Sequence, residues 1–411
     1  MGKQFNIAIL GLGVVATGVI EELLAAKEKI QEISAVDVNI TKVLVRSKEK
    51  KQEQARKYNL NFETNIEKIL NDPTIDLVIE LIGGIHPAKE WILQALEQKK
   101  HVITANKDLI AQYGDELTSS AEKNQVSLLY EASVAGGIPI LRNLNQHFLT
   151  DKVTAFEGIL NGTSNYMLTQ MAQEGMTFDE SLQQAQALGF AESDPTNDVD
   201  GFDVAYKLMI LIRLAFKVKV ALKDLKIRGI RSITTKDIYQ ARVFGYRIKL
   251  IAQASQTSKG TIAQVAPKLM AEKNPLATVD NEMNAVCLHS QYLGTSMFYG
   301  PGAGSLPTAA SVMNDLLAIL QADFKEVPVQ MSRSTLAAAE IITAEKTSYY
   351  ISYTGKTDIR SFLDKDPLHF YSQAEDIYLI TAKMTTAEIN EFLEKVQNSG
   401  KINQKLEIME G

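Results

Sequence analysis

The chain has 411 residues, of which 45% are hydrophobic and 22% are charged, so it is long enough for about two or three globular domains. This composition excludes a disordered protein, a collagen-like fibre and a small disulfide-rich scaffold. Acidic residues outnumber basic ones by 49 to 43, and the formal net charge of −6 argues against a nucleic-acid-binding protein.

The first residues, MGKQFNIAILGLG, run directly into a strand-like pattern and lack the separate apolar region of a secretory signal. The longest apolar stretch, 208–216, contains Arg213 and is too short to span a bilayer. Cys287 is the single cysteine, so no intramolecular disulfide can form. We therefore expect a cytoplasmic protein in a reducing compartment, with neither a membrane nor nucleic acid among its partners.

Strand and helix signals alternate through the first 130 residues. Short apolar runs predict strands at 5–10, 41–45, 77–82, 101–104 and 126–130. Apolar residues at helical spacing predict helices at 19–29, 63–70, 89–98 and 113–123. This alternation, with continuous apolar strands, predicts an α/β fold built on a Rossmann-type doubly wound parallel sheet in residues 1–131.

Residues 132–321 are of mixed type and predict a second domain of the α+β class. Helices are predicted at 139–147, 164–174, 178–188, 202–216 and 307–321, and strands at 152–160, 260–265 and 285–287. The helix at 307–321 follows a glycine-rich loop and is expected to return to the first domain. A polar linker is predicted at 322–347, and a small βαββαβ domain at 348–411, with its helices at 357–363 and 386–397.

A nucleotide-binding motif follows the first strand. It consists of Gly11, Leu12, Gly13, Val14, Val15 and Ala16. In a strand–turn–helix context such a G-x-G-x-x-A motif lets a pyrophosphate approach the backbone at a helix N-terminus. The alternative is a glycine turn with only a structural role.

The second strand ends in Arg46, where an NAD-specific protein would carry an acidic residue that binds the ribose hydroxyl. Because the guanidinium suits the extra phosphate of NADP, NADP is favoured, with NAD possible and a solvated basic surface as the alternative. Gly83 and Lys107 follow two further strands at the sheet edge where α/β proteins bind ligands. On position alone Lys107 could equally be a surface lysine.

The most specific segment is A-x3-GFA-x2-DP-x2-DV-x-G-x-D-x3-K at 185–207. Asp203 and Lys207 are four residues apart on the predicted helix 202–216, so their side chains can meet. The helix is otherwise almost wholly apolar, which favours a half-buried lysine next to a carboxylate in a functional site. Acidic residues that only cap the helix are the alternative.

These residues resemble the homoserine dehydrogenase family. The signature at 185–207 matches at every specified position, and collinear similarities occur in GLGVV, ITANK, EASVAGGIP, NGTSNYM and GPGAGSLPTA. The resemblance implies NAD(P)-dependent interconversion of L-aspartate 4-semialdehyde and L-homoserine in threonine, methionine and isoleucine biosynthesis. It also implies a homodimer or homotetramer with a C-terminal ACT-like domain.

The resemblance assigns acid–base work to Lys207, with Lys107 as a second candidate and Asp203 beside them. It implies that homoserine contacts Gly162, Thr163, Glu192, Asp198, Asp203 and Lys207. It implies further cofactor contacts at Gly189, Gly302 and Gly304. A monovalent cation, sodium or potassium, would be held by Glu131, Val134, Gly136 and Ile138.

One departure from the family pattern, the role of the single cysteine and two rival functions remain to be considered. The turn 354–357 lacks the proline usual in amino-acid-binding ACT domains, so we expect weak or absent inhibition by threonine, and we expect deletion from about 348 to leave the sites intact. Cys287 has an apolar setting that favours a buried structural thiol over a nucleophile. The rivals are a Rossmann oxidoreductase for another amino-acid-derived aldehyde and an NADP-dependent regulatory protein without turnover.

Overall fold

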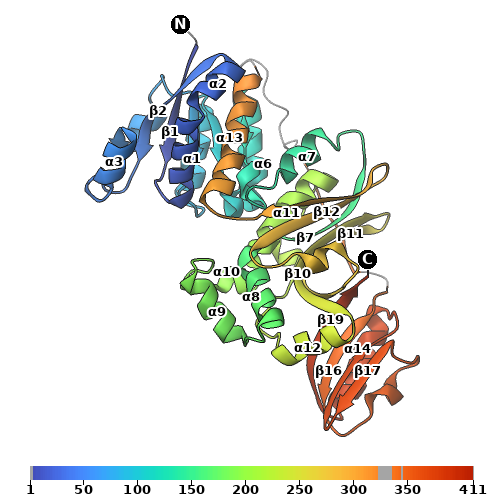
Figure 1. The fold of residues 1–411 in the computed structure, drawn as a ribbon. Helices are drawn as coiled ribbons and strands as arrows, with labels where there is room; N and C mark the ends of the chain where they lie inside the picture. The colour runs from blue at the N-terminus through green and yellow to red at the C-terminus, as the bar shows by residue number, and fades with distance from the viewer. Residues whose placement is uncertain (1–2, 323–335, 344–345, 411) are drawn as a thin grey trace.

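The computed structural model describes residues 3–322, 336–343 and 346–410 (Figure 1). Much of the predicted linker, 323–335 and 344–345, therefore lies outside the described residues. The described part of the linker holds two short strands, β14 (Ala337–Ala338) and β15 (Ile341–Ile342). Among the helices of the described ranges, none is long and apolar enough to cross a bilayer.

The N-terminal sheet is parallel, with strand order β3-β2-β1-β4-β5-β6, which confirms the predicted Rossmann-type topology. Its strands are β1 (Lys3–Leu10), β2 (Val36–Leu44), β3 (Phe62–Glu63), β4 (Leu77–Glu80), β5 (His101–Thr104) and β6 (Leu128–Leu129). The motif-bearing strand β1 lies in the middle of the sheet, and β4 is buried along its whole length. This arrangement brings the carboxyl ends of β1, β4 and β5 to one edge of the sheet.

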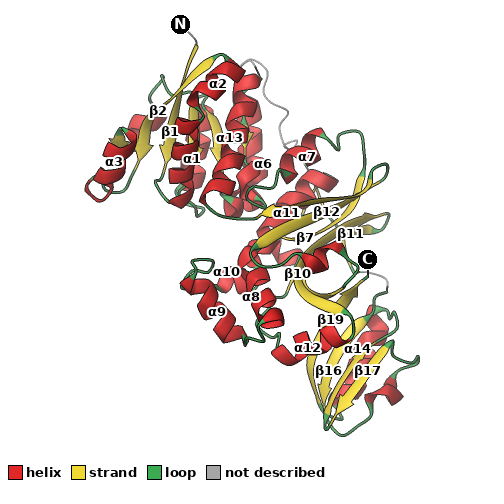
Figure 2. Ribbon diagram, in the orientation of Figure 1, coloured by secondary structure: helices red, strands yellow, loops and turns green. Residues whose placement is uncertain are grey.

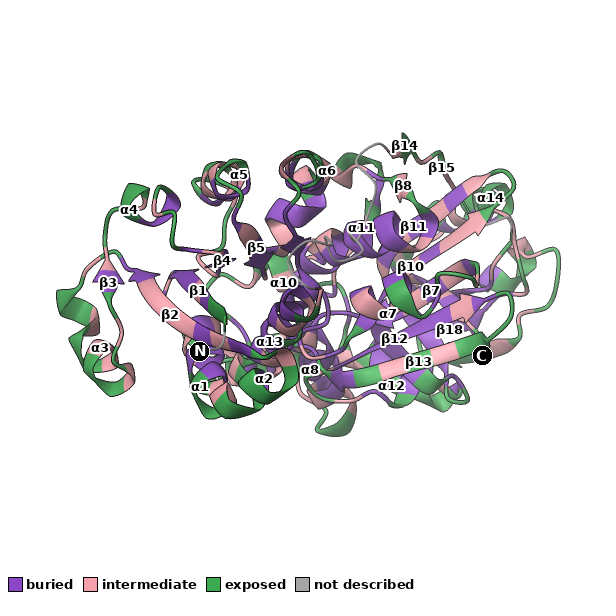
Figure 3. Ribbon diagram, turned by 90° about the horizontal axis from the view of Figure 1, so that it is seen from above, coloured by how far each residue is buried: buried purple, intermediate pink, exposed green. Residues whose placement is uncertain are grey.

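Helices cover both faces of this sheet, as Figure 3 shows with α4, α5 and α6 on one side and α1, α2 and α13 on the other. They are α1 (Val14–Ala25), α2 (Lys27–Ser34), α3 (Gln52–Tyr58), α4 (Glu67–Leu70), α5 (Ala88–Glu97), α6 (Lys107–Asn124) and α13 (Ser305–Gln321). The late helix α13 lies beside α1, where Gly18 leaves room for Ser305, whose atoms would be 2.6 Å from an added Cβ. The helix expected at 19–29 is in fact divided between two helices that are separated by Ala26, and α1 begins already at Val14, immediately after the glycine turn.

The central region contains an antiparallel sheet in the order β13-β12-β7-β10-β11. Its strands are β7 (Val153–Ile159), β10 (Tyr246–Thr257), β11 (Gly260–Ala271), β12 (Met283–Ser290) and β13 (Gly294–Pro301). The accompanying helices are α7 (Ile140–Gln146), α8 (Gly162–Gln173), α9 (Phe178–Ala187), α10 (Thr196–Val199), α11 (Phe202–Phe216) and α12 (Thr235–Val243). Sequence patterning missed β10 and half of β11, because the buried Lys249 and Lys268 interrupt their apolar runs.

The C-terminal unit is an antiparallel sheet in the order β19-β16-β18-β17 with one helix, α14 (Thr386–Gln397). Its strands are β16 (Tyr349–Thr354), β17 (His369–Gln373), β18 (Asp376–Ile380) and β19 (Lys401–Met409). The helix predicted at 357–363 is wrong, because only a 3-10 turn forms at Ile359–Phe362. The Asp358 side chain accepts a hydrogen bond from the Arg360 amide and caps that short turn.

The C-terminal unit shares its sheet with the central region, as the adjoining strands in Figure 2 indicate. Strand β19 pairs in parallel with β11, so that Lys268 lies opposite Glu407. The Lys268 side chain, 3% exposed, forms a 2.7 Å ion pair with Glu407. Burial lowers the pKa of Lys268, and the neighbouring carboxylate opposes that effect. The Tyr350 hydroxyl adds a buried hydrogen bond to Asp237 in the central region.

Because the sheet is shared, deletion of residues 348–411 should change the stability of the remaining chain, which sequence patterning did not show. The deletion removes the carboxylate that compensates the Lys268 ammonium, and losing one partner of a buried pair costs about 3–5 kcal/mol. We expect Lys268→Met to destabilise the full-length chain but to stabilise the truncated one. Urea unfolding of the four proteins measures this reversal of sign, and the same sign in both backgrounds would refute it.

Candidate active site

The turn after β1 is shaped for close approach of a ligand to the backbone. Gly11 has a φ of 97°, and a Cβ there would lie 2.9 Å from the Ile82 side chain, so only glycine fits. Gly13 precedes the first turn of α1, where Val14 is 72% exposed. The N-terminal amides of α1 are therefore available to an anion.

A groove of about 820 Å³ runs from this turn along the carboxyl ends of the strands. Gly11, Leu12, Gly13 and Arg46 line it together with Ser47, Lys50 and Lys51. Lysine and arginine are the only charged residues among those that line the groove, which suits a phosphate-bearing ligand. Trp91 of α5 also lines this groove.

A buried carboxylate joins the ends of β4 and β5. Glu80 accepts hydrogen bonds from the amide of Gly83 at 3.1 Å and from the Thr104 hydroxyl at 2.6 Å. Two residues further on, the Asn106 side chain caps α6, whose first residue is Lys107. Gly83 and Lys107 are thus fixed to the same sheet edge, although Gly83 itself does not line the groove.

Three charged side chains meet where the two halves of the molecule face each other. Asp203 Oδ1 lies 3.1 Å from Lys107 Nζ, and Asp203 Oδ2 lies 2.8 Å from Lys207 Nζ. Burial alone would raise the pKa of Asp203, but the ammonium groups of Lys207 and Lys107 hold it well below its usual range. The Asp203 carboxylate in turn raises the pKa of Lys107. Asp203 is therefore an anion that fixes two cations.

Leu160 and Asn161, the two residues that follow β7, complete this cluster through their main-chain and side-chain contacts. Lys207 Nζ donates to the carbonyl of Leu160 at 2.6 Å. The Asn161 amide donates to Asp203 at 2.9 Å and to Asp198 at 2.7 Å, while its oxygen caps α8. Sequence analysis missed Asn161 as a site residue, although its place one residue before the predicted Gly162 and Thr163 was a usable signal.

A second cavity, of about 620 Å³, opens onto this cluster. Its lining includes every residue that the resemblance assigned to substrate, namely Gly162, Thr163, Glu192, Asp198, Asp203 and Lys207. It also includes Val15, Lys107, Gly136, Gly189, Gly302 and Gly304. Val15 lines this cavity and Gly13 lines the groove, so the two spaces meet at the start of α1.

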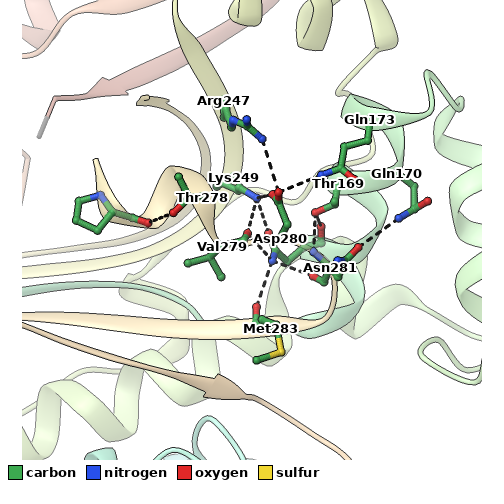
Figure 4. A network of polar contacts seen from close by, with 12 residues as sticks. Thr169, Gln170, Gln173, Arg247, Lys249, Thr278, Val279, Asp280, Asn281 and Met283 are labelled. Atoms are coloured by element: carbon green, nitrogen blue, oxygen red, sulfur yellow. Dashed lines mark hydrogen bonds and ion pairs between the residues drawn. The ribbon is translucent and has the colours of Figure 1, made fainter. Parts of the chain in front are cut away.

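Glu282 also lines this second cavity, and sequence analysis did not single it out. Its segment is held by the polar network in Figure 4, in which the buried Lys249 contacts Asp280 at 3.1 Å and the Val279 carbonyl. The side-chain amide nitrogen of Asn165, on α8, lies within hydrogen-bonding distance of three carbonyls of the same segment, at Val279, Asn281 and Met283. The segment 279–283 is therefore a rigid wall of the cavity, against which Gly162 packs at its Cα.

Comparisons with known proteins agree with this geometry. A family model described as homoserine dehydrogenase matches residues 139–317, and one described as homoserine dehydrogenase, NAD binding domain, matches residues 11–131. Homoserine dehydrogenase from Lactococcus lactis is 48% identical over 318 residues, which are 77% of this chain and 74% of the relative. Homoserine dehydrogenase from Bacillus subtilis is 44% identical over 319 residues, covering 78% and 73%. The chain belongs to the homoserine dehydrogenase family.

Solved structures support the same conclusion. Homoserine dehydrogenase from Thiobacillus denitrificans superposes with a TM-score of 0.94 at 33% identity and covers 100% of both chains. A hyperthermophilic archaeal homoserine dehydrogenase in complex with NADPH has a TM-score of 0.67 at 25% identity and covers 80% of this chain. The enzyme is thus an oxidoreductase that interconverts L-aspartate 4-semialdehyde and L-homoserine and carries an NAD(P)-binding domain. This confirms the resemblance found in the sequence.

The loop 131–138 of this homoserine dehydrogenase contains a buried carboxylate. Glu131, 1% exposed, accepts hydrogen bonds from the amides of Leu141 and Arg142, and its own amide donates to the buried Asp315. Burial, reinforced by Asp315, raises the pKa of Glu131 to about 8. Burial likewise raises the pKa of Asp315 to about 7. Two adjacent buried acids therefore lack full compensation by positive charge.

The other residues of this loop fit a cation cradle only in part. Val134 and Ile138 are buried, and Gly136 has a φ of 51°, but its carbonyl already accepts the Ser311 hydroxyl at 2.6 Å. Within the described ranges, no cluster of three or more His, Cys, Asp or Glu side chains could hold a metal. Any ion here would depend on main-chain carbonyls and Glu131.

Cys287 is buried in β12, and burial raises the pKa of its thiol to about 12. A thiol that stays protonated at neutral pH is a poor nucleophile. This agrees with the structural role expected from its apolar neighbours. The nearby His289 is held by Glu157, which its Nε2 contacts at 2.8 Å.

Proposed function

We propose that Lys207 is the general acid–base of this homoserine dehydrogenase. The observation that carries the proposal is the buried cluster of Lys107, Asp203 and Lys207 on the wall of the substrate cavity. An ammonium has three N–H donors, and Lys207 uses two of them on Leu160 and Asp203. The third donor is left for the oxygen of a substrate.

The chemistry needs one hydride and one proton. When bound, the nicotinamide supplies the hydride for aldehyde reduction or accepts it during homoserine oxidation. In reduction, the aldehyde carbon gains the hydride, and its oxygen takes the proton that Lys207 holds. In oxidation, neutral Lys207 accepts the hydroxyl proton while the C–H bond gives up its hydride. Lys107 stands next to the developing negative charge as a fixed cation.

The cavity has the groups needed to orient an amino acid. We assign the α-ammonium of homoserine to the carboxylates of Glu192 and Asp203, with Asp198 supporting the latter through Asn161. The substrate carboxylate is assigned to the amides of Gly162 and Thr163, at the N-terminus of the twelve-residue helix α8. The Thr163 hydroxyl itself is occupied by the carbonyl of Phe190.

We further propose NADP as the preferred cofactor, with NAD as a slower substitute. Arg46 and its basic neighbours on the groove support this choice, as does the NADPH complex of the archaeal enzyme. Gly11, Leu12, Gly13, Val14 and Val15 are assigned to the pyrophosphate, and Gly83, Gly189, Gly302 and Gly304 to further backbone contacts.

A monovalent cation, sodium or potassium, is proposed at the loop 131–138. Glu131 and the carbonyls of Val134, Gly136 and Ile138 would hold it, and its charge would compensate the buried pair of Glu131 and Asp315. Hard oxygen ligands suit such an ion, which would fix the loop that borders the substrate cavity.

The wider organisation is also a proposal. We divide the chain into a nucleotide domain at 1–131 with α13 returning to it, a substrate and dimerisation domain at 132–321, a linker at 322–347 and an ACT-like domain at 348–411.

The buried free thiol supports a cytoplasmic location. Exposed Met297 and Tyr299 on the edge strand β13 support a homodimer or homotetramer. The proline-free turn at 354–357 supports weak inhibition by threonine.

Lys207→Ala should lower kcat by about 10²–10⁴-fold, because the proton donor is lost, while the KM for NADP stays nearly constant. Steady-state oxidation of homoserine measures both constants. The ion pair of Lys89 and Glu116 lines neither the groove nor the substrate cavity and gives a matched control, so Lys89→Ala should change neither constant. A normal kcat for Lys207→Ala with a large loss for Lys107→Ala would reverse the two roles.

Arg46→Asp should lower kcat/KM for NADP by roughly 10–100-fold, the worth of a charge-assisted hydrogen bond, with little loss for NAD. The substitution replaces a phosphate-binding cation by an anion that can accept the ribose hydroxyl. Initial rates with each cofactor measure the ratio. Lys48→Ala is the control, because Lys48 is close in sequence but does not line the groove. An unchanged ratio would remove Arg46 from the cofactor site.

Potassium or sodium chloride should raise the Tm at pH 8 more than choline chloride of equal ionic strength, because only a small cation can neutralise Glu131 and Asp315. Glu131→Gln should abolish the difference between the salts. Glu157→Gln removes a carboxylate that pairs with His289 outside the loop and should retain the difference. Equal responses to all three salts in the wild-type enzyme would eliminate the cation proposal.

A further inference from the structure

Helix α11, which carries Asp203 and Lys207, contains one buried arginine among apolar residues. Arg213 is only 3% exposed, and it interrupts the apolar character of the buried run from Leu208 to Leu214. A buried guanidinium is costly unless acceptors surround it, so such a residue needs an explanation. The acid–base chemistry described above does not use it.

The acceptors of Arg213 all lie on one other helix, α6. Nη1 donates to the carbonyl of Ile110 at 2.7 Å, and Nη2 donates to the carbonyl of Ala111 at 3.1 Å. Nε lies 3.1 Å from Asp115 Oδ1 in an ion pair that lacks hydrogen-bond alignment. Asp115 Oδ2 is held from outside by Lys219 at 2.9 Å. A single side chain of α11 thus contacts main-chain and side-chain acceptors over about one turn of α6.

A glycine on α6 leaves the space that the Arg213 guanidinium needs for these contacts. A Cβ added to Gly114 would lie 2.2 Å from Nη1 of Arg213, well inside van der Waals contact. Glycine lowers helix stability relative to alanine, so its place inside the eighteen-residue helix α6 is unfavourable on helix propensity alone. The space it leaves is filled by the guanidinium.

The two helices joined in this way both begin at the reacting groups. Helix α6 starts at Lys107, and Ile110 and Ala111 come about one turn later, roughly 5 Å along its axis. Helix α11 starts at Phe202, next to Asp203, and the ion pair of Lys107 with Asp203 closes the open end at 3.1 Å. α6 belongs to the nucleotide-binding half, whereas α11 belongs to the substrate half.

We propose that Arg213 is a positioning residue that sets the separation between Lys107 and the pair of Asp203 and Lys207. The inference deepens the proposed function and rests on it, since it concerns the same lysines. Rigid contacts one turn from Lys107 fix where its ammonium stands relative to Asp203. A displacement of about 1 Å in such a site can lower the rate by about 10²-fold.

The test uses three variants of the full-length enzyme. Arg213→Lys keeps the charge but loses the two-pronged donation, and Gly114→Ala keeps Arg213 but displaces its guanidinium. Both should lower kcat for homoserine oxidation by about 10–100-fold and leave the KM for NADP within about twofold. Lys219→Met removes only the outer partner of Asp115 and should keep a normal kcat.

A double-variant cycle separates positioning from general stability. In a Lys107→Ala background, Arg213→Lys and Gly114→Ala should cause little further loss of kcat, because the group that they position is already absent. Gly114→Ala should also keep its Tm within about 5 °C, since alanine favours the helix. Should Arg213→Lys not fold, Gly114→Ala carries the test alone.

Two results would overturn the proposal. The first is a normal kcat for a folded Gly114→Ala variant. The second is that Gly114→Ala lowers kcat by the same factor in the Lys107→Ala background as in the wild-type enzyme. Failure of the proposed function looks different, because Lys107→Ala and Lys207→Ala would then both retain normal kcat. In that case a crystal structure of Gly114→Ala still tests the positioning role. We expect the distance from Lys107 Nζ to the Asp203 carboxylate to exceed 4 Å, and an unchanged distance would refute the proposal.

Discussion

The site depends on one buried anion held between two cations. Asp203 is 5% exposed, and its carboxylate stays charged because Lys207 and Lys107 approach it from two different helices. Removing a charge from water is costly, so the buried carboxylate depends on the compensation that these two ammonium groups supply. The same attraction draws together the N-termini of α6 and α11. Electrostatics thereby couples the folding of the two halves to the geometry of the reaction.

Everything around the cluster restricts how far these helices can move. Asn161 links Asp203 to the cap of α8, Glu80 links the ends of β4 and β5, and Lys249 fixes the wall that carries Glu282. In each case a buried polar group finds partners from elements distant in sequence. Such a group would destabilise the fold if it had no hydrogen-bond partner. When it is paired, it favours the one arrangement of the helices and strands that supplies its partners. The cluster of Lys107, Asp203 and Lys207 is therefore positioned by buried polar contacts as much as by the apolar core.

The described C-terminal residues are joined to the catalytic part more closely than a flexible appendage would be. Strand β19 extends the central sheet by pairing with β11, and the buried pair of Lys268 and Glu407 lies at that junction. A change in the position of α14 or β16 would therefore act on β11 and its neighbour β10. β10 bears Lys249, which contacts the segment that walls the substrate cavity. A continuous path of main-chain pairing and buried polar contacts connects the tail to the site.

The sequence by itself determined the features that local pattern controls. The strand at 101–104, the helices at 202–216 and 386–397, the motif at Gly11 and the four-residue spacing of Asp203 and Lys207 all follow from periodicity or turn chemistry. Tertiary structure alone decided which distant elements meet: Lys107 with Asp203, Arg213 with α6, and β19 with β11. Those pairings rest on buried polar and charged groups, which interrupt the hydrophobic pattern and so hide β10 and much of β11. A one-dimensional pattern records the period of burial but not the partner across the interface, because that partner is chosen by long-range complementarity of charge and shape.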